Sequence, residues 1–134
     1  MLDPDTYAEM SYSGIYAIID GDTEEVLYIG RSNCLARRYC EHKWSMLRAD
    51  VFGIDDDKYR ILNWLYNQGH NLVFYVLEEV GADGIKERET WYIRTFLPPL
   101  NTTDIPEMLG SVVERYKKTK SYEKLRQEVK FLWL

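Results

Sequence analysis

Two aromatic triplets near the start of the chain, Gly14-Ile15-Tyr16 and Tyr28-Ile29-Gly30, carry phenol groups that could take part in proton transfer. Each triplet lies in a β-rich run, and the turn signal Asp20-Gly21-Asp22 separates the runs, which predicts a β-hairpin. The strands of a hairpin lie about 5 Å apart and the two glycines fall at the same end, so Tyr16 and Tyr28 can be cross-strand neighbours. Ordinary packing explains such aromatics equally well, because they are frequent in sheets.

A guanidinium and an imidazole follow the second triplet at helical spacing. Arg38 and His42 are four residues apart, which places them on one face of a helix predicted over 34–48. An arginine fork suits a phosphate, and a histidine titrates near neutral pH and can move protons. The helix follows the second strand directly, so its first turns should lie near the hairpin. Two surface polar residues would give the same pattern.

An acidic residue further along the chain has apolar neighbours on its own helical face. Glu89 shares that face with Ile85 and Ile93, so we expect its carboxylate to be partly buried and to need a cation, a metal ion or a proton. A boundary glutamate that pairs with a nearby arginine or lysine fits the same pattern. Asn101 follows a Pro-Pro-Leu segment, where an asparagine is most often a turn residue.

The elements that must position these residues follow the order ββααβαα. Strands are predicted over 14–20, 25–30 and 71–78, and helices over about 34–48, 55–69, 85–96 and 106–131. This order predicts an α+β fold, in which a small three-stranded antiparallel sheet is flanked by helices and followed by an extra C-terminal helix. We expect an N-terminal lead-in (1–12), one domain (13–104) and a C-terminal helical extension (105–134) packed on the same domain.

The composition is that of one globular domain, with 134 residues of which 46% are apolar and 29% charged. The net charge of −5 argues mildly against a nucleic-acid partner, but basic residues concentrate in 31–48 and in 114–130. Each basic stretch is either an anion-binding face or a plain solvated helix face.

Several classes of protein are disfavoured by the sequence. Its apolar runs are too short to span a bilayer, and we find neither a basic leader nor an apolar signal segment. We therefore expect a cytoplasmic protein with no membrane partner. Cys34 and Cys40 form neither a disulfide framework nor a four-ligand zinc site, so we expect reduced thiols.

In their order and spacing, these residues resemble the GIY-YIG nuclease family. The resemblance covers residues 13–103, and its most specific part is Tyr-Ile-Gly-x-Ser-x-x-Leu-x-x-Arg-x-x-x-His from Tyr28 to His42. Glu-x-x-Tyr-Ile from Glu89 and Pro-Pro-Leu-Asn, ending at Asn101, follow later. The family resemblance implies a three-stranded antiparallel sheet with flanking helices. It also implies hydrolysis of a DNA phosphodiester bond with one divalent ion, Mg²⁺ or Mn²⁺.

The resemblance also assigns roles by position. Glu89 would be the metal ligand, Tyr16 the group that activates water, and Arg38 the phosphate clamp. Tyr28 and His42 would assist Tyr16 or the water. Asn101 would hold the site in shape. The two phenols, the guanidinium, the imidazole and the acid should meet in one exposed hollow.

Tyrosine is a weak base at neutral pH, so Tyr16 needs help in the implied role. Its reference pKa is about 10, so only about one phenol in a thousand is ionised at pH 7. It must be assisted by cations or pass its proton onward. The available helpers are His42 and either Arg31 or Arg38. Arg38 and a metal ion on Glu89 would also stabilise the charge that grows on the phosphate.

DNA is the expected partner, held through its backbone. Four basic residues would contact phosphates without reading bases: Arg31, Arg37, Lys43 and Arg48. The sequence contains no recognisable second DNA-reading domain, so target choice would come from DNA shape, a loop, a homodimer or a partner protein.

Two alternatives stay open. The chain could be a catalytically weak DNA-binding module of the same fold, as its acidic net charge would allow. It could also be a protein-interaction domain that uses the apolar end 129–134, although we favour packing of that end on the core.

Overall fold

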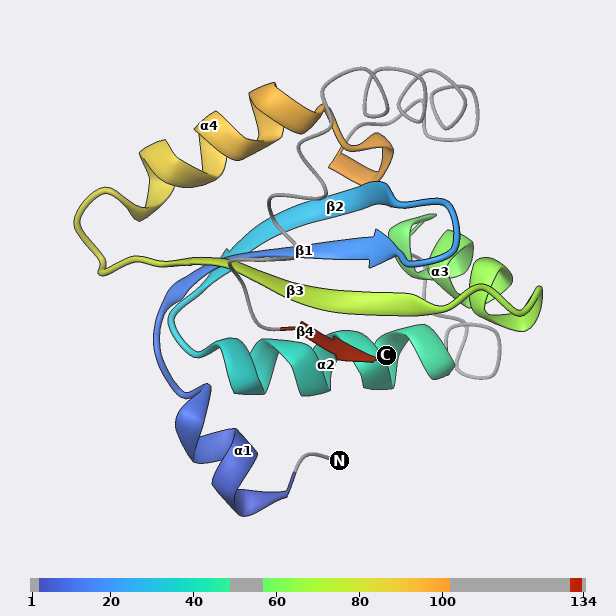
Figure 1. Ribbon diagram of the computed structural model, residues 1–134, viewed down its shortest axis with the longest axis horizontal. Coiled ribbons are helices and arrows are strands. Elements are labelled where there is room, and N and C mark those ends of the chain that lie inside the picture. Colours follow the sequence, from blue (N-terminus) through green and yellow to red (C-terminus); the bar gives the residue numbers. More distant parts are fainter. Residues whose placement is uncertain (1–2, 49–56, 102–130, 134) are drawn as a thin grey trace.

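The computed structural model describes residues 3–48, 57–101 and 131–133 and has an α+β fold (Figure 1). Its sheet has the strand order β2-β1-β3-β4, and all three pairings are antiparallel. The strands are β1 (Gly14–Asp20), β2 (Glu25–Ser32), β3 (Leu72–Glu79) and β4 (Phe131–Trp133). The predicted three-stranded core of the sheet is therefore confirmed, with β1 in the middle.

The described helices surround this sheet. They are α1 (Pro4–Glu9), α2 (Leu35–Leu47), α3 (Asp57–Asn67) and α4 (Ile85–Phe96), followed by the short 3₁₀ turn η1 (Pro99–Asn101). The Asp3 carboxylate caps α1 by accepting a hydrogen bond from the backbone N–H of Thr6, and α4 ends at Leu97, whose φ of 48° is left-handed. Each helix that the sequence predicted within the described residues is present.

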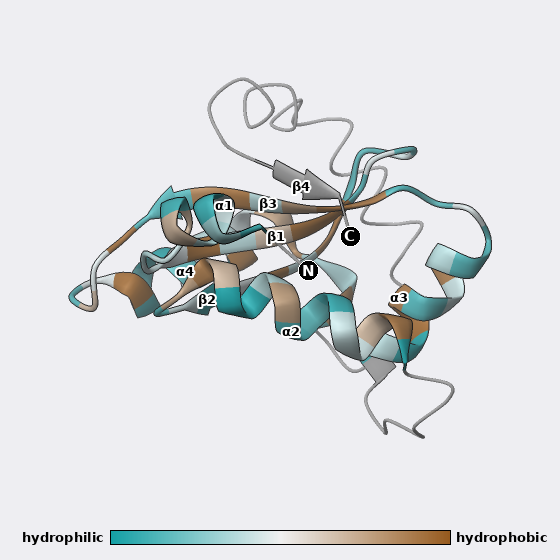
Figure 2. Ribbon diagram, turned by 90° about the horizontal axis from the view of Figure 1, so that it is seen from below, coloured by the Kyte–Doolittle hydropathy of each residue, from teal (hydrophilic) through white to brown (hydrophobic). Residues whose placement is uncertain are grey.

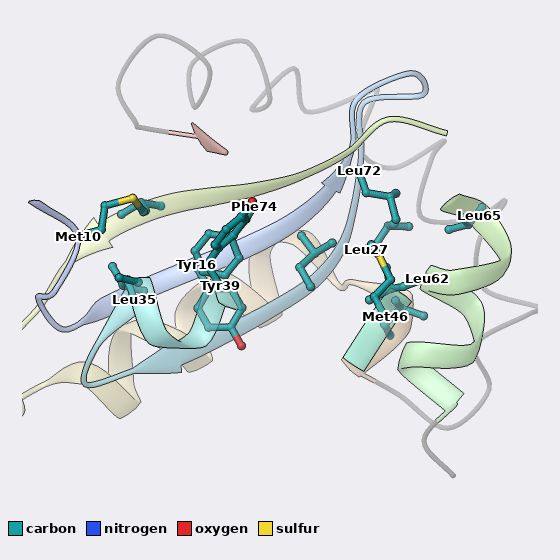
Figure 3. Packing of buried hydrophobic residues seen from close by; sticks show 14 residues of the cluster. Met10, Tyr16, Leu27, Leu35, Tyr39, Met46, Leu62, Leu65, Leu72 and Phe74 are labelled. Atoms are coloured by element: carbon teal, nitrogen blue, oxygen red, sulfur yellow. The ribbon is translucent and has the colours of Figure 1, made fainter. Parts of the chain in front are cut away.

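Alternating side chains of the strands build two separate cores. Tyr16 and Ile18 of β1 face α2 and α3, in a cluster that also holds Phe74 (Figure 3). Ile15, Ala17 and Ile19 of the same strand face the other way and pack with residues of α4. Figure 2 shows the strands as mostly hydrophobic, as expected for a sheet covered on both faces. The helices therefore form two layers, with α2 and α3 on one face of the sheet and α4 on the other.

The C-terminal end differs from its prediction. A helix was expected over 106–131, and most of that range lies outside the described residues. Phe131–Trp133, however, forms β4, which pairs with Val73, Phe74 and Tyr75 of β3. These last residues are therefore extended and add a fourth strand to the sheet. Pairing also covers the β3 edge, which would otherwise expose backbone N–H and C=O groups.

The hairpin has the predicted turn. The Asp20 carboxylate accepts hydrogen bonds from the backbone N–H groups of Asp22 and Thr23, and a bulge shifts the register between Ile18 and Ile19. Glu24 adopts a positive φ of 64° at the end of the turn. Cys34 and Cys40 are free thiols, as expected.

Candidate active site

Three side chains from three elements form a hydrogen-bonded chain inside the domain. The hydroxyl of Tyr16 on β1 lies 2.6 Å from Nε2 of His42 on α2, and the hydroxyl of Tyr59 on α3 lies 2.9 Å from Nδ1 of the same ring. Tyr16 and His42 are each only 2% exposed. A neutral imidazole has one N–H and one bare nitrogen, so one phenol donates to the ring and the other accepts from it.

Glycine at position 30 makes room for the Tyr16 ring. Gly30 is the direct partner of Tyr16 in the hairpin, and a Cβ there would lie 2.4 Å from the Tyr16 hydroxyl oxygen. The ring can therefore lie across β2 only where β2 has no side chain. On its other side the ring stacks on Phe74, with centroids 4.7 Å apart (Figure 3).

The two phenols of the triplets are diagonal neighbours rather than directly opposed. Tyr28 pairs with Ile18, while Tyr16 pairs with Gly30, and the two phenol ring centroids are 6.2 Å apart. Tyr28 also lies 5.9 Å from the His42 ring, edge-on. The structure thus brings together three of the residues that the sequence singled out.

Burial decides the charge state of this cluster. It holds the pKa of Tyr16 well above its ordinary value of 10, and Tyr28 raises that pKa further, whereas Arg38 acts in the opposite direction. Burial also lowers the pKa of His42 to about 3, and the positive charges of Lys58 and Arg38 lower it further. Both groups are therefore uncharged at neutral pH, and the predicted cationic help from Arg38 is outweighed by burial.

Cations surround this cluster. The Arg38 Nη1 lies 3.1 Å from Glu41, but its Nε is buried and has no hydrogen-bond partner. The Lys58 ammonium lies 4.5 Å from the Tyr28 ring centroid and 4.7 Å from that of Tyr59. Two positive side chains thus lie beside this cluster, which favours an anionic ligand.

Glu89 approaches from the other layer. It lies on α4, and its carboxylate is 3.6 Å from Nη1 of Arg31. Arg31 follows Gly30 in β2, so Glu89 and the Tyr16 hydroxyl reach neighbouring residues of one edge strand from opposite faces of the sheet. The described contacts of the phenols do not include Glu89. The residues expected in a single hollow are therefore divided between the two faces of the sheet.

Asn101 is more than a turn residue. Its Oδ1 accepts a hydrogen bond from the backbone N–H of Ile29 at 2.9 Å, and its Nδ2 donates to the Ile29 carbonyl at 2.8 Å. The side chain thus pairs with β2 as a strand would, and fixes the residue between Tyr28 and Gly30.

The proposed phosphate contacts fall into two groups. One group lies on α2 and just after it, and consists of Arg37, Lys43 and Arg48. Arg37, near the start of α2, contacts Asn33 and Glu41. Lys43 lies over Tyr39, and Arg48 over Trp44. Lys43, Trp44 and Arg48 line a groove of about 930 Å³ between α1 and α2. Arg31 stands apart, on β2 with Glu89.

A second polar cluster lies at the turn of the hairpin. Asp20, Asp22 and His70 bring their ligand atoms within 4.8 Å of one another and could hold a metal ion. His70 Nδ1 lies 2.6 Å from the Asp20 carboxylate. Sequence reasoning identified Asp20 and Asp22 only as turn residues, since nothing in the sequence placed His70, 50 residues later, beside them.

Tyr59 was also missed. It stands at the start of α3, 17 residues after His42, and only the packing of α3 on α2 brings the two rings together.

Comparison with models of known protein families, with curated proteins and with solved structures finds no match to this chain. Within the part of the chain that the structure describes, no helix is both long and apolar enough to cross a bilayer.

Proposed function

We propose that this chain is a metal-dependent DNA endonuclease that hydrolyses phosphodiester bonds. The observation that carries the proposal is the buried chain from Tyr16 through His42 to Tyr59, beside the half-exposed Arg38. A site that must activate water needs a route for its proton, and a phosphodiester needs a cation beside it. The GIY-YIG resemblance supports the same conclusion independently of this geometry.

The charge state of the cluster limits how the proton travels. Burial holds the pKa of Tyr16 above 10 and lowers that of His42 to about 3, so transfer of a proton between them to form a buried ion pair is strongly unfavourable. We therefore propose a relay whose members stay neutral. Tyr16 takes a proton from the attacking water as its own proton passes to Nε2 of His42.

The imidazole then completes the relay. As Nε2 gains a proton, Nδ1 gives its own to Tyr59, which is half-buried and releases a proton to solvent. The water oxygen attacks phosphorus, the bond to the leaving oxygen breaks, and the leaving oxygen takes a proton from solvent. No buried charge forms at any step, which matches the low polarity around His42.

Arg38 would contact the phosphate, and Glu89 would hold a divalent ion beside it. The Arg38 side chain is half-exposed, so the accessible part of its guanidinium can donate hydrogen bonds to a phosphate oxygen. Glu89 fits a divalent ion, because its carboxylate is only partly buried and its Arg31 contact, at 3.6 Å, is too long for a tight hydrogen bond. Mg²⁺ keeps several waters and needs few protein ligands. When bound, the ion would offset the negative charge of the phosphate in the transition state.

The substrate would lie across the edge of β2. Gly30 and Arg31 are adjacent there, and they meet the Tyr16 hydroxyl and the Glu89 carboxylate from opposite faces. A DNA strand that crosses this edge could contact both halves of the site. Arg37, Lys43 and Arg48 on α2 would hold flanking phosphates.

Two observations favour a second candidate, a DNA-binding module without useful catalysis. Tyr16 is 2% exposed, and Glu89 lies on the layer opposite to its ring. Such a protein would bind DNA without a metal requirement and would cleave no DNA form.

Nicking of supercoiled plasmid in Mg²⁺ separates the two candidates. The comparison uses the wild type, Glu89→Gln, and Glu87→Gln as a control on the exposed side of the same helix. We expect nicking by the wild type and Glu87→Gln, its loss in EDTA, and a decrease of roughly 100-fold or more in Glu89→Gln. Circular dichroism checks that Glu89→Gln and Glu87→Gln are folded. Equal nicking by a folded Glu89→Gln and the wild type would refute the metal role of Glu89. Metal-independent binding with no nicking would select the second candidate.

A further inference from the structure

The turn of the β1–β2 hairpin and the start of β3 are joined by polar contacts. The Oδ1 of Asp20 accepts a hydrogen bond from the backbone N–H of Asp22 in the turn, and its Oδ2 contacts Nδ1 of His70. Asp22 accepts two hydrogen bonds from Asn71, one from its backbone N–H and one from its side chain. The Gly21 N–H donates to the Asn71 carbonyl at 2.7 Å. Segments about 50 residues apart in the chain therefore meet here in a fixed arrangement.

A third acidic side chain, Glu25, faces this group and is not compensated. Glu25 is the direct cross-strand partner of Asp20, so both side chains lie on the same face of the sheet, about 5 Å apart at Cβ. Glu25 is 6% exposed, and its Oε1 is buried without a hydrogen-bond partner. Buried carboxylates are normally paired or coordinate a metal ion, and two of them directly opposite repel each other. Among the described residues, the His70 imidazole is the one basic side chain with a contact to Asp20.

We propose that Asp20, Asp22 and His70 form a binding site for a divalent transition-metal cation, with Glu25 beside it. The cation would take the position that a proton occupies between His70 Nδ1 and the Asp20 carboxylate. Its positive charge would offset the repulsion between Asp20 and Glu25.

The donor set indicates which cations fit. Carboxylate oxygens suit Mg²⁺, Ca²⁺ and Mn²⁺, whereas an imidazole nitrogen suits Zn²⁺, Fe²⁺ and related ions. A mixed set of carboxylates and one imidazole is common to Mn²⁺ and Zn²⁺. We therefore assign the site to this class of ion and not to Ca²⁺, which takes oxygen ligands.

The site is distinct from the proposed catalytic one and independent of it. Its ligands lie at the turn end of the hairpin, whereas Gly14 and Gly30 mark the other end of the strand pair. Its role would be structural, because one ion would link the end of β1, the turn and the segment before β3. A ligand that binds only the folded chain stabilises it by mass action.

Mn²⁺ titration followed by NMR and thermal unfolding tests this inference. Mn²⁺ broadens the resonances of nuclei close to it, so bound ion at the hairpin should broaden the amide signals of Thr23 and Asn71. We expect Mn²⁺ or Zn²⁺ to raise the melting temperature of the wild-type chain above its value in EDTA. Asp22→Asn and His70→Gln should weaken Mn²⁺ binding by about tenfold or more.

Glu89→Gln is the matched control, since it removes the other proposed metal ligand. It should leave the hairpin broadening unchanged even where nicking is lost, and hairpin binding with no nuclease activity would defeat only the proposed function. The inference would be overturned by absence of any Mn²⁺ or Zn²⁺ effect. Broadening that Asp22→Asn and His70→Gln leave unchanged, or that disappears in Glu89→Gln alone, would equally overturn it. Asp22 is exposed, so Asp22→Asn is expected to fold.

Discussion

Replacing His42 with glutamine gives a quantitative test of the neutral, buried imidazole. The sign of its effect follows from linkage: the pKa of His42 falls from 6.5 in the unfolded chain to about 3 in the folded one. Between these values the unfolded chain binds more protons, so this histidine makes the protein less stable as the pH falls. The contribution of neutral His42 to the free energy of unfolding is fully present above pH 6.5 and is lost as the pH falls toward 3.

The size of the effect follows from the same two values. At pH 5, which is about 1.5 units below the unfolded pKa, protonation of His42 stabilises the unfolded chain by about 2 kcal/mol. His42 in the folded protein stays neutral at this pH and gains no such stabilisation. Glu25 titrates in the same range with the opposite sign, because burial raises its pKa to about 7. The stability difference between wild type and His42→Gln isolates the histidine, and should shrink by about 2 kcal/mol from pH 7 to pH 5.

Two measurements check this expectation. Urea unfolding of both proteins at several pH values gives the stability difference. NMR titration of the imidazole signals gives the pKa directly, and assignment is simple because the chain has two histidines. We expect the His42 signals to stay constant from pH 8 to pH 5. A His42 pKa near 6.5, or a stability difference that does not vary with pH, would refute the reasoning.

Three further substitutions probe the site. Gly30→Ala should lower the free energy of unfolding by about 1–3 kcal/mol and decrease nicking, because its Cβ would clash with the Tyr16 hydroxyl. Gly81→Ala, at a position with open space around it, is the control in thermal unfolding. Asn101→Ala should cost about 1–3 kcal/mol by leaving the edge strand without two hydrogen bonds, and an unchanged midpoint in urea would contradict this. Tyr59→Phe should slow single-turnover cleavage by about tenfold or more while leaving DNA affinity unchanged; a wild-type rate would remove Tyr59 from the relay.

Most of the fold could be predicted from the sequence because its signals are local. The β-rich apolar run in 14–20 and the turn at Asp20-Gly21-Asp22 define the hairpin from neighbouring residues alone. The strand at Phe131–Trp133 could not be predicted in this way. Its conformation depends on pairing with β3, about 60 residues earlier in the chain, and not on local propensity.

The site was predicted in part for the same reason. Spacing correctly placed Tyr16 near Tyr28 and His42, since a hairpin and the helix after it are close in sequence and in space. It could not show that α4 covers the opposite face of the sheet, because the same amphipathic pattern fits either face. Glu89 therefore reaches the edge of β2 from the far layer. The contact of Tyr59 with His42 likewise depends on how α3 packs.

Single-turnover cleavage of a labelled DNA duplex by Tyr16→Phe tests the central claim most directly, because the phenol oxygen is the proposed acceptor of the proton from water. The exposed Tyr66 provides the matched control, Tyr66→Phe. We predict a rate decrease of roughly 100-fold to 10,000-fold for Tyr16→Phe and none for Tyr66→Phe. Cleavage by a folded Tyr16→Phe at the wild-type rate would contradict the account.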